Sequence, residues 1–151
     1  MAQFEFKVSF AEQADLAWIL ENDSHISDAM VKRKLAAGEY LIAKAGGTPA
    51  GCLRIGRLWS MIPFIEVIWV EDRFQRRGIG RGLVAALAEH GRSQGQPLIL
   101  SSSQADEPAA QAFHRAVGFR DAGALSDLRP LQTVSEIFFV RETGQAPAGP
   151  N

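Results

Sequence analysis

The stretch from Val67 to Gly82 places the strongest constraint on how this chain can fold. It begins with an apolar, β-branched run that ends at Val70, which predicts a strand. A charged segment follows, and then three glycines stand two residues apart: Gly78, Gly80 and Gly82. Apolar residues come next at helical spacing: Leu83, Val84 and Leu87. The sequence therefore predicts a strand, a glycine turn and the start of a helix.

Such a junction is suited to holding phosphate. The first amides of a helix have no intrahelical partner, and the helix dipole adds about half a positive charge there. Glycines let phosphate approach the backbone without interference from a Cβ atom. Four guanidinium groups, each a phosphate donor, stand within nine residues: Arg73, Arg76, Arg77 and Arg81.

Two well-known phosphate motifs do not fit this stretch. A P-loop requires Lys and then Ser or Thr after its last glycine, whereas Arg81-Gly82 follows Gly80 here. A dinucleotide fingerprint requires Gly-x-Gly-x-x-Gly, and the chain continues from Gly82 into Leu83. The glycine turn must therefore serve another phosphate ligand or be an ordinary strand-to-helix connection.

Length and composition point to one globular domain. The chain has 151 residues, 46% of them hydrophobic, and a formal net charge of −1, so we expect a sizeable core and neither a nucleic-acid nor a membrane surface. Its single cysteine, Cys52, excludes an internal disulfide and a cysteine-based metal site, and we expect no metal. We expect a cytoplasmic protein, with a domain over residues 1–141 and a disordered tail over 142–151.

Hydrophobic periodicity predicts the remaining elements. Helices are expected over 11–22, over 27–37, from the glycine turn to about 94, and from 106 to 117. The residues expected to face inward are Ala14, Leu16 or Ala17, and Leu20 on the first; Ala29, Met30, Val31 and Leu35 on the second; and Ala109, Ala112, Phe113 and Ala116 on the last. Strands are expected over 4–8, 40–45, 50–58, 64–70, 98–101, 119–124 and 134–140.

Two motifs and this element order resemble the GCN5-related N-acetyltransferase (GNAT) family. The first is Gln75-Arg76-Arg77-Gly78-Ile79-Gly80, similar to the pyrophosphate-binding motif of that family, and the second runs from Phe113 to Phe119. The resemblance covers nearly the whole chain. It implies an α/β (α+β) fold whose central mixed, mostly antiparallel sheet has about seven strands, is splayed between strands 4 and 5, and is flanked by about four helices.

The resemblance also implies acetyl-CoA as cosubstrate. Backbone amides of Gln75, Arg76, Arg77, Gly78, Ile79 and Gly80 would hold the pyrophosphate. Arg76 and Arg81 would reach the pyrophosphate or the 3′-phosphate, and Gly82 and Phe113 are further candidate cofactor contacts. Ile68, Trp69 and Val70 would pair through their backbones with the pantetheine arm, as an added strand does. The Trp69 side chain itself has the pattern of a core residue, and Arg73 is equally well explained as a solvated turn residue.

The implied reaction is attack of a neutral amine on a thioester. Deprotonating an amine with a pKa of about 10.4 costs about 4.6 kcal/mol at pH 7. Aligning the amine with the thioester can supply about 7–11 kcal/mol, so positioning matters more than any single acid or base. Glu66 is the candidate base, since several family members carry a glutamate at that place on the fourth strand. A salt-bridged or exposed strand glutamate is the alternative.

The sequence departs from the family pattern at the acid. The usual thiolate-protonating tyrosine falls at His114, and the only tyrosine of the chain is Tyr40. His114 is the candidate acid, with a packed or partly exposed helix residue as the alternative. Asp106 and Glu107 stand where many members have an asparagine.

The acceptor is the least specified part. The resemblance implies a small-molecule amine or a protein N-terminus, and a homodimer by analogy. Asp23, Asp28 and Asp127 could hold a cationic acceptor, and His25 and Trp59 an apolar part, although each also fits a solvated loop. A non-catalytic acyl-CoA-binding module of the same fold is the competing function, since it would keep Gln75–Gly80 and need neither Glu66 nor His114.

Overall fold

The computed structural model describes residues 3–144. These residues cluster into two compact units, each described here by itself. Unit 1 holds the chain up to Gly56 together with Val67–Ala86, and unit 2 holds Arg57–Glu66 together with the chain from Leu87 onward. The expectation of a single domain over 1–141 stays a prediction.

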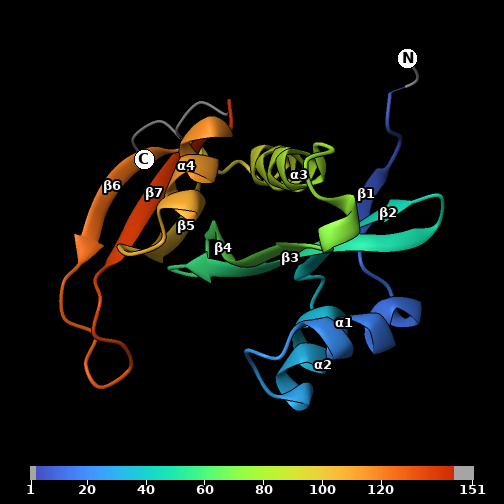
Figure 1. Cartoon of the computed structure of the whole chain (residues 1–151), viewed down its shortest axis with the longest axis horizontal. Coiled ribbons are helices and arrows are strands. Elements are labelled where there is room, and N and C mark those ends of the chain that lie inside the picture. Colours follow the sequence, from blue (N-terminus) through green and yellow to red (C-terminus); the bar gives the residue numbers. More distant parts are fainter. Residues whose placement is uncertain (1–2, 145–151) are drawn as a thin grey trace. The chain divides into compact units, whose positions relative to one another are not determined.

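The described residues form four α-helices and seven strands, in the predicted order (Figure 1). The helices are α1 (Leu16–Asn22), α2 (Asp28–Ala36), α3 (Ile79–Ser93) and α4 (Pro108–Ala116), with 3-10 turns η1 (Gln13–Asp15) and η2 (Asp72–Phe74). The strands are β1 (Lys7–Phe10), β2 (Tyr40–Ala45), β3 (Thr48–Leu58), β4 (Ile62–Val70), β5 (Leu98–Gln104), β6 (Arg120–Leu125) and β7 (Glu136–Glu142). They follow the sheet order β1-β2-β3-β4-β5-β7-β6. The predicted mixed α/β fold is therefore confirmed, while the splay between strands 4 and 5 stays a prediction.

Unit 1 has helices on both faces of its strands. Antiparallel β2 and β3 are joined by Gly46 and Gly47, whose φ angles of 56° and 81° make a two-residue hairpin turn. Ile19 of α1, Val31 and Leu35 of α2, and Tyr40 of β2 form one buried cluster. Figure 1 shows α1 and α2 below these strands and the first half of α3 above them.

The first helix differs from its prediction. It begins as the 3-10 turn η1, and its buried residues are Asp15 and Ile19 rather than Ala14 or Ala17, which are exposed. The Asp15 carboxylate accepts a hydrogen bond from the Glu12 amide at 2.8 Å and pairs with Lys44 Nζ at 2.8 Å. Leu16 and Leu20 do pack against the buried cluster, as predicted, so hydrophobicity placed the inward face correctly at these positions and missed the buried Asp15.

The second helix is correct in extent and partly correct in phase. Ser27 caps it by accepting from the Met30 amide at 3.2 Å, and Gly38 closes it with φ 71°. Val31 and Leu35 are buried as predicted, but Ala29 is exposed and the Met30 side chain is 39% exposed. The inward face is narrower than the hydrophobic pattern suggested.

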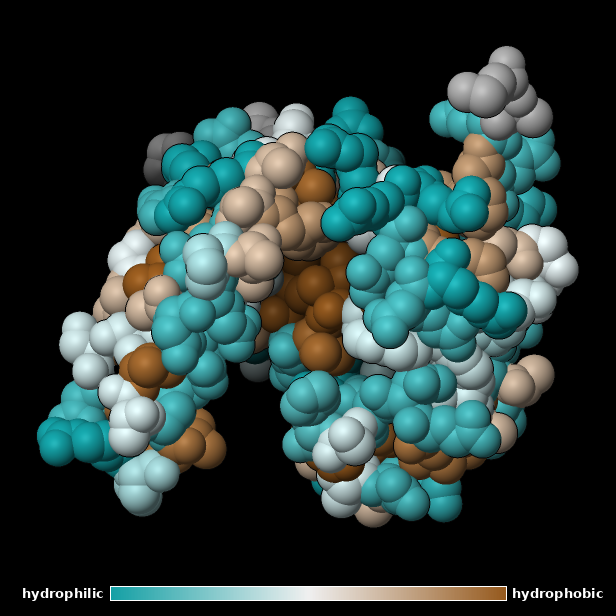
Figure 2. Space-filling model, viewed as in Figure 1, coloured by the Kyte–Doolittle hydropathy of each residue, from teal (hydrophilic) through white to brown (hydrophobic). Residues whose placement is uncertain are grey.

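Unit 2 is built around the strands β5 and β7. Parallel β4 and β5 pair Phe64 with Leu100 and Ile65 with Ser101. Antiparallel β7 pairs with β5 along Leu98–Gln104 and with β6 on its other side. Figure 2 shows apolar and polar residues side by side on the loop that joins β6 to β7.

Two predictions need correction in unit 2. On α4 the buried residue is His114, which stacks on Phe139 of β7, while Ala109, Ala112 and Ala116 are exposed and Phe113 is half-buried. The expected tail was placed from residue 142, but Glu142 belongs to β7 and Thr143 donates to the Pro97 and Gln96 carbonyls at 3.0 and 2.6 Å. Residues 145–151 of that tail lie outside the described residues.

Candidate functional site

The segment between β4 and α3 has a conformation suited to binding an anion. The turn η2 ends at Phe74, and α3 begins at Ile79. Between them Arg76 and Gly78 take left-handed φ angles of 62° and 85°. Left-handed residues in such a turn direct successive amides toward a common point, and the dipole of α3 adds positive potential there. We call residues 75–81 the phosphate loop.

The hydrogen bonds of the phosphate loop show which amides the fold already uses. Gln75 donates its amide to the Asp72 carbonyl at 3.2 Å, and its side chain donates to the Val70 carbonyl at 3.1 Å. The Gly82 amide donates to the Gly78 carbonyl at 2.9 Å, as the first helical bond. Since the first amides of a helix have no partner within it, the amides of residues 76–80 are the candidates for holding a ligand.

The glycines of the motif have different roles. An added Cβ at Gly78 would meet nothing within 4 Å, so its surroundings are open and only its positive φ requires glycine. A Cβ at Gly82 would lie 2.6 Å from Phe6 Cε2. The structure therefore gives Gly82 a packing role beneath the Phe6 ring. Its cofactor contact stays a prediction.

Two of the four arginines lie over aromatic rings. Arg73 Cζ is 4.6 Å from the Phe74 ring centroid, and its Nε donates to Glu71 at 3.0 Å. Arg77 Cζ is 4.8 Å from the Phe4 ring centroid. Arg76 is exposed on the phosphate loop. The roles of Arg76, Arg77 and Arg81 at phosphate stay predictions.

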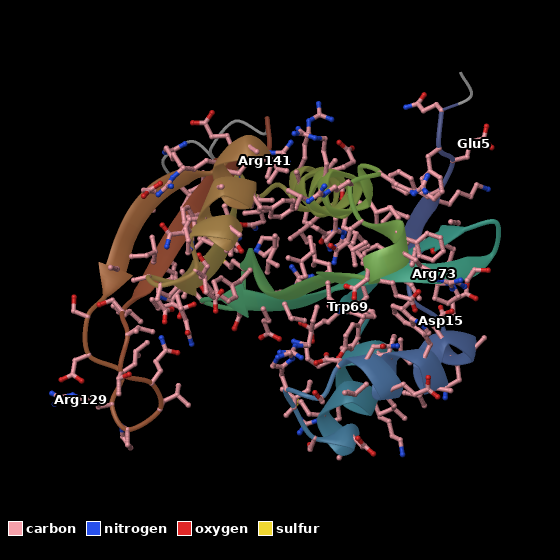
Figure 3. The ribbon with its side chains drawn as sticks, viewed as in Figure 1. Glu5, Asp15, Trp69, Arg73, Arg129 and Arg141 are labelled. Carbon is pink, nitrogen blue, oxygen red and sulfur yellow. The ribbon has the colours of Figure 1, made fainter. Side chains whose placement is uncertain are left out.

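The end of β4 borders a hollow of about 460 Å³ lined by Asn22, Trp69, Glu71, Asp72 and Arg73. The Trp69 ring lies 5.4 Å from that of Trp18, so its side chain packs against α1, which fits the core interpretation of this tryptophan. Figure 3 shows Trp69 projecting from β4 toward α1, and Arg73 on the turn that follows. The last residues of β4, Ile68, Trp69 and Val70, therefore lie beside this hollow, just ahead of the phosphate loop.

Glu66 and His114, the two candidate catalytic residues, lie in unit 2, whereas Ile68–Gly82 lies in unit 1. Glu66 is exposed on β4, directly after Ile65, which pairs with Ser101. A carboxylate at an exposed position can reach an amine substrate that arrives from solvent, as a general base must. Phe113, the remaining candidate, is half-buried on α4.

His114 is packed into unit 2. Its side chain is 3% exposed, stacks on Phe139 with centroids 4.6 Å apart, and meets Phe119 edge-on. Its Nε2 lies 2.6 Å from Ser101 Oγ, while Nδ1 is buried without a hydrogen bond of good geometry. Burial lowers the pKa of His114, and the nearby Ala110 carbonyl opposes this with a smaller effect. This geometry favours the packed-residue alternative over direct proton donation.

The residues proposed for the acceptor site differ in burial and in whether their side chains are already paired. Asp23 is 4% exposed and accepts hydrogen bonds from Tyr40 at 2.6 Å and from Arg54 Nη1 at 2.7 Å, so it does not offer a free carboxylate. Asp127 is exposed but holds Arg129 through two bonds of 2.9 and 2.8 Å. The other candidates are Asp28, His25 and Trp59, all exposed.

The sequence did contain a signal for one residue that the prediction missed. Arg54 stands within the buried run of β3, between Leu53 and Ile55, where a charge needs a partner. That partner is Asp23. Ser101, the neighbour of His114, had no comparable signal, because a small polar residue on a strand is compatible with many environments.

Among residues 3–144, no three histidine, cysteine, aspartate or glutamate side chains are grouped so as to hold a metal ion. Within the same range, no helix is long and apolar enough to cross a membrane. The expected absence of a metal stays a prediction.

Comparison with known proteins gives the family. The model of the acetyltransferase (GNAT) family matches residues 5–119. N-alpha-acetyltransferase RimI of Mycobacterium tuberculosis is 33% identical over 112 residues, which cover 71% of this chain and 69% of that protein. Aminoglycoside N(6')-acetyltransferase type 1 of Stenotrophomonas maltophilia is 36% identical over 62 residues, 41% of this chain and 40% of that protein.

The fold agrees with this assignment. The yncA acetyltransferase structure from Salmonella typhimurium, solved with its cofactor acetyl-CoA, has a TM-score of 0.74 and covers 97% of this chain and 98% of its own, at 19% identity. At that identity the likeness concerns the fold alone. The family match over most of the chain, together with the glycine turn between β4 and α3, shows that this protein belongs to the acetyltransferase (GNAT) family of acyl-CoA-dependent N-acyltransferases.

Proposed function

We propose that this protein transfers the acetyl group of acetyl-CoA to a primary amine, by direct attack in a ternary complex. The observation that carries the proposal is the phosphate loop, in which two left-handed residues, Arg76 and Gly78, lead into the N-terminus of α3. The loop amides would hold the pyrophosphate, and the backbones of Ile68–Val70 would pair with the pantetheine arm.

In the proposed reaction, the amine nitrogen forms a bond to the acetyl carbon and the bond from that carbon to sulfur breaks. Glu66 takes the proton that the amine loses, directly or through water. The CoA thiolate leaves and takes a proton from solvent water, and Glu66 returns its proton to the solvent, so the charges balance. Water is assigned this role because His114 is buried and lies against Ser101. A thiol pKa near 8.5 makes protonation of the thiolate worth only about 2 kcal/mol at pH 7.

The acceptor is proposed as a class. RimI of M. tuberculosis is named an N-alpha-acetyltransferase, and the S. maltophilia relative is named an aminoglycoside acetyltransferase. Both names specify amines, and the first match covers more of this chain. A protein N-terminus and a small-molecule amine are therefore the two acceptors to assay, with acetyl-CoA in both cases.

The cofactor assignment is tested by Gly78→Ala and its matched control Gly95→Ala. Both glycines have positive φ, 85° and 74°, and open space at the Cβ position, so each change strains the backbone by a similar amount, about 1–2 kcal/mol. Only Gly78 lies in the phosphate loop. Calorimetry should show at least a tenfold loss of acetyl-CoA affinity in Gly78→Ala and wild-type affinity in Gly95→Ala. Equal affinities in the two folded variants would contradict the assignment.

The catalytic assignment is tested by thiol release from acetyl-CoA with a panel of peptide N-termini and small amines. Glu66→Gln should lower kcat by about 10²–10⁴-fold with any accepted amine and leave acetyl-CoA affinity intact, as expected for a general base. Glu89→Gln, an exposed glutamate of α3, serves as control. Cofactor binding without thiol release toward any amine would instead favour the non-catalytic acyl-CoA-binding module.

A further inference from the structure

The segment ahead of β1 is held to unit 1 by its aromatic side chains. Residues 3–6 belong to no described helix or strand, and the ladder of β1 with β2 begins at Lys7. A hollow of about 760 Å³, lined by Gln3–Lys7, Gly46 and Gly47, lies along one side of the segment. Phe4 and Phe6 are nevertheless half-buried, with ring centroids 6.3 Å apart. What they contact therefore decides where the segment lies.

Phe4 contacts the entrance of the phosphate loop. Its ring centroid lies 6.3 Å from that of Phe74, the last residue of η2, at an interplanar angle of 41°. The Arg77 guanidinium, within the phosphate loop, stands 4.8 Å above the Phe4 ring. Tilted ring pairs and a cation over a ring face are both attractive arrangements. Phe4 thus contacts one residue of the phosphate loop, Arg77, and the residue just ahead of the loop, Phe74.

Phe6 contacts the exit of the same loop. Its ring edge occupies the space in which Gly82 would carry a Cβ, 2.6 Å from Cε2 and 2.8 Å from Cζ. Gly82 is in the first turn of α3, and its amide makes the helical bond to Gly78. One short segment therefore packs against the residues on both sides of the phosphate loop.

We propose that Phe4 and Phe6 form an aromatic brace that fixes the phosphate loop in its acetyl-CoA-binding conformation. The proposal rests on the function proposed above. The loop contains a left-handed non-glycine residue, Arg76, and such strained conformations persist only where the surroundings hold them. If a fraction of molecules has the competent loop, the apparent Kd is the intrinsic Kd divided by that fraction. Phe4 and Phe6 are positioning residues and need not touch the cofactor.

The first experiment replaces Phe4. Phe4→Ala should raise the Kd and the KM for acetyl-CoA about five- to tenfold, corresponding to a loss of most of the competent loop population. The kcat at saturating acetyl-CoA should change less than twofold, because bound cofactor restores the loop. Phe4→Tyr keeps the ring and should retain wild-type values. Glu5→Ala removes the intervening side chain, which Figure 3 shows pointing away from the ribbon, and is the matched control.

The second experiment displaces Phe6 without altering the segment. Gly82→Ala should push the Phe6 ring aside, since the clashing atoms are the far end of a flexible side chain, and alanine favours a helix over glycine. Amide hydrogen exchange without ligand should then be faster over residues 75–81 in both Phe4→Ala and Gly82→Ala than in Glu5→Ala, with global unfolding midpoints within a few degrees.

These readouts separate the brace from the function on which it rests. Unchanged loop exchange and unchanged Kd in folded Phe4→Ala would overturn the brace, even where Gly78→Ala shows that the loop binds acetyl-CoA. A parallel loss in Glu5→Ala would also overturn it. If the wild-type protein binds no acetyl-CoA, the proposed function fails, and the exchange measurement alone then decides whether the brace holds the loop.

Discussion

Asp23 shows how strongly a single residue can be changed by its surroundings. Burial alone would raise the pKa of its carboxyl, but hydrogen bonds from Tyr40 and Arg54 and the charge of Arg54 outweigh that effect and lower it. Its side chain lies in unit 1 with Arg54 Nη1 at 2.7 Å from Oδ1 and 2.6 Å from Oδ2. The pair joins the connection between α1 and α2 to the middle of β3. We interpret it as a structural anchor and not as an acceptor site.

Removing one partner of this pair should be strongly destabilising. Asp23→Ala removes the buried carboxylate that pairs with the Arg54 charge, which we expect to cost about 3–5 kcal/mol of unfolding free energy in denaturant titrations. The double variant Asp23→Ala, Arg54→Met should cost less than the sum of the two single changes. Because the pKa of Asp23 is lowered, its stabilisation is present above the ordinary value of 3.8 and is lost as pH falls through the folded-state value. Additive costs would contradict this account.

His114 leads to a prediction about acid sensitivity. Burial lowers its pKa from the ordinary 6.5, so the unfolded chain binds more protons than the folded one below that value. Stability should therefore be full above pH 6.5 and decline as pH falls toward the folded-state pKa, by about 1.4 kcal/mol per pH unit while only the unfolded state is protonated.

Denaturant unfolding between pH 8 and pH 5 would measure this dependence. His114→Gln should flatten the part of the slope that histidine supplies. Ser101→Ala removes the neighbour 2.6 Å from Nε2 but keeps the imidazole, so the pH dependence should persist in that variant even at lower stability. An identical slope in wild type and His114→Gln would show that other groups cause the acid sensitivity.

At the scale of elements, close approach of two strands explains a glycine that the sequence pattern passed over. A Cβ added to Gly51 of β3 would lie 2.7 Å from the Trp69 carbonyl oxygen of β4 and 3.3 Å from Val70 Cα. These are backbone atoms and cannot turn away as a side chain can. The glycine allows β3 to lie against the part of β4 that we propose for pairing with pantetheine.

Gly51→Ala should therefore cost about 1–3 kcal/mol of unfolding free energy, the usual range for overpacking. Since the strain falls on Trp69 and Val70, acetyl-CoA affinity should fall in the same variant. Thr48→Ala, at the exposed start of β3, is the control and should change neither quantity measurably. Wild-type stability and affinity in Gly51→Ala would show that the strands can separate at little cost.

At the scale of the whole molecule, the question is whether the acetyl group passes through a covalent enzyme intermediate. Cys52 is the only cysteine of the sequence and is 2% exposed. Burial, followed by the charge of Asp23, raises the pKa of its thiol to about 12. Since the thiolate is the reactive form, Cys52 is unsuited to accept the acetyl group.

Initial-rate kinetics should therefore give intersecting lines when acetyl-CoA and the amine are varied together, as direct transfer in a ternary complex requires. Cys52→Ala should keep kcat within about twofold, because the thiol takes no part in the proposed chemistry. Parallel lines, or acetylation of the protein recovered by mass spectrometry at Cys52, would contradict direct attack. The measurement is independent of which amine the protein accepts.

Much of the fold could be predicted from the sequence because it depends on local patterns. The order of helices and strands follows from hydrophobic periodicity. Gly38 ends α2 and Gly46-Gly47 form the turn between β2 and β3, because glycine readily adopts positive φ. The phosphate loop is also a local feature, since its strand, glycine turn and helix start are consecutive in the chain. The family match over residues 5–119 agrees with what these residues suggested.

Only the tertiary structure decided which residues face inward and what they touch. The sequence offered Asp23 for a cationic acceptor, His114 for the acid and Gly82 for the cofactor, but it did not indicate that they pack against Arg54, Ser101 and Phe6, which are remote in sequence. Periodicity misplaces such positions because it ranks side chains by hydrophobicity, and a buried polar group is stabilised by a partner that the neighbouring sequence does not contain. The sequence by itself determined the order of the elements and the glycine turn between β4 and α3. Contacts between distant segments decided the buried polar pairs and the packing of Phe4 and Phe6 around that turn.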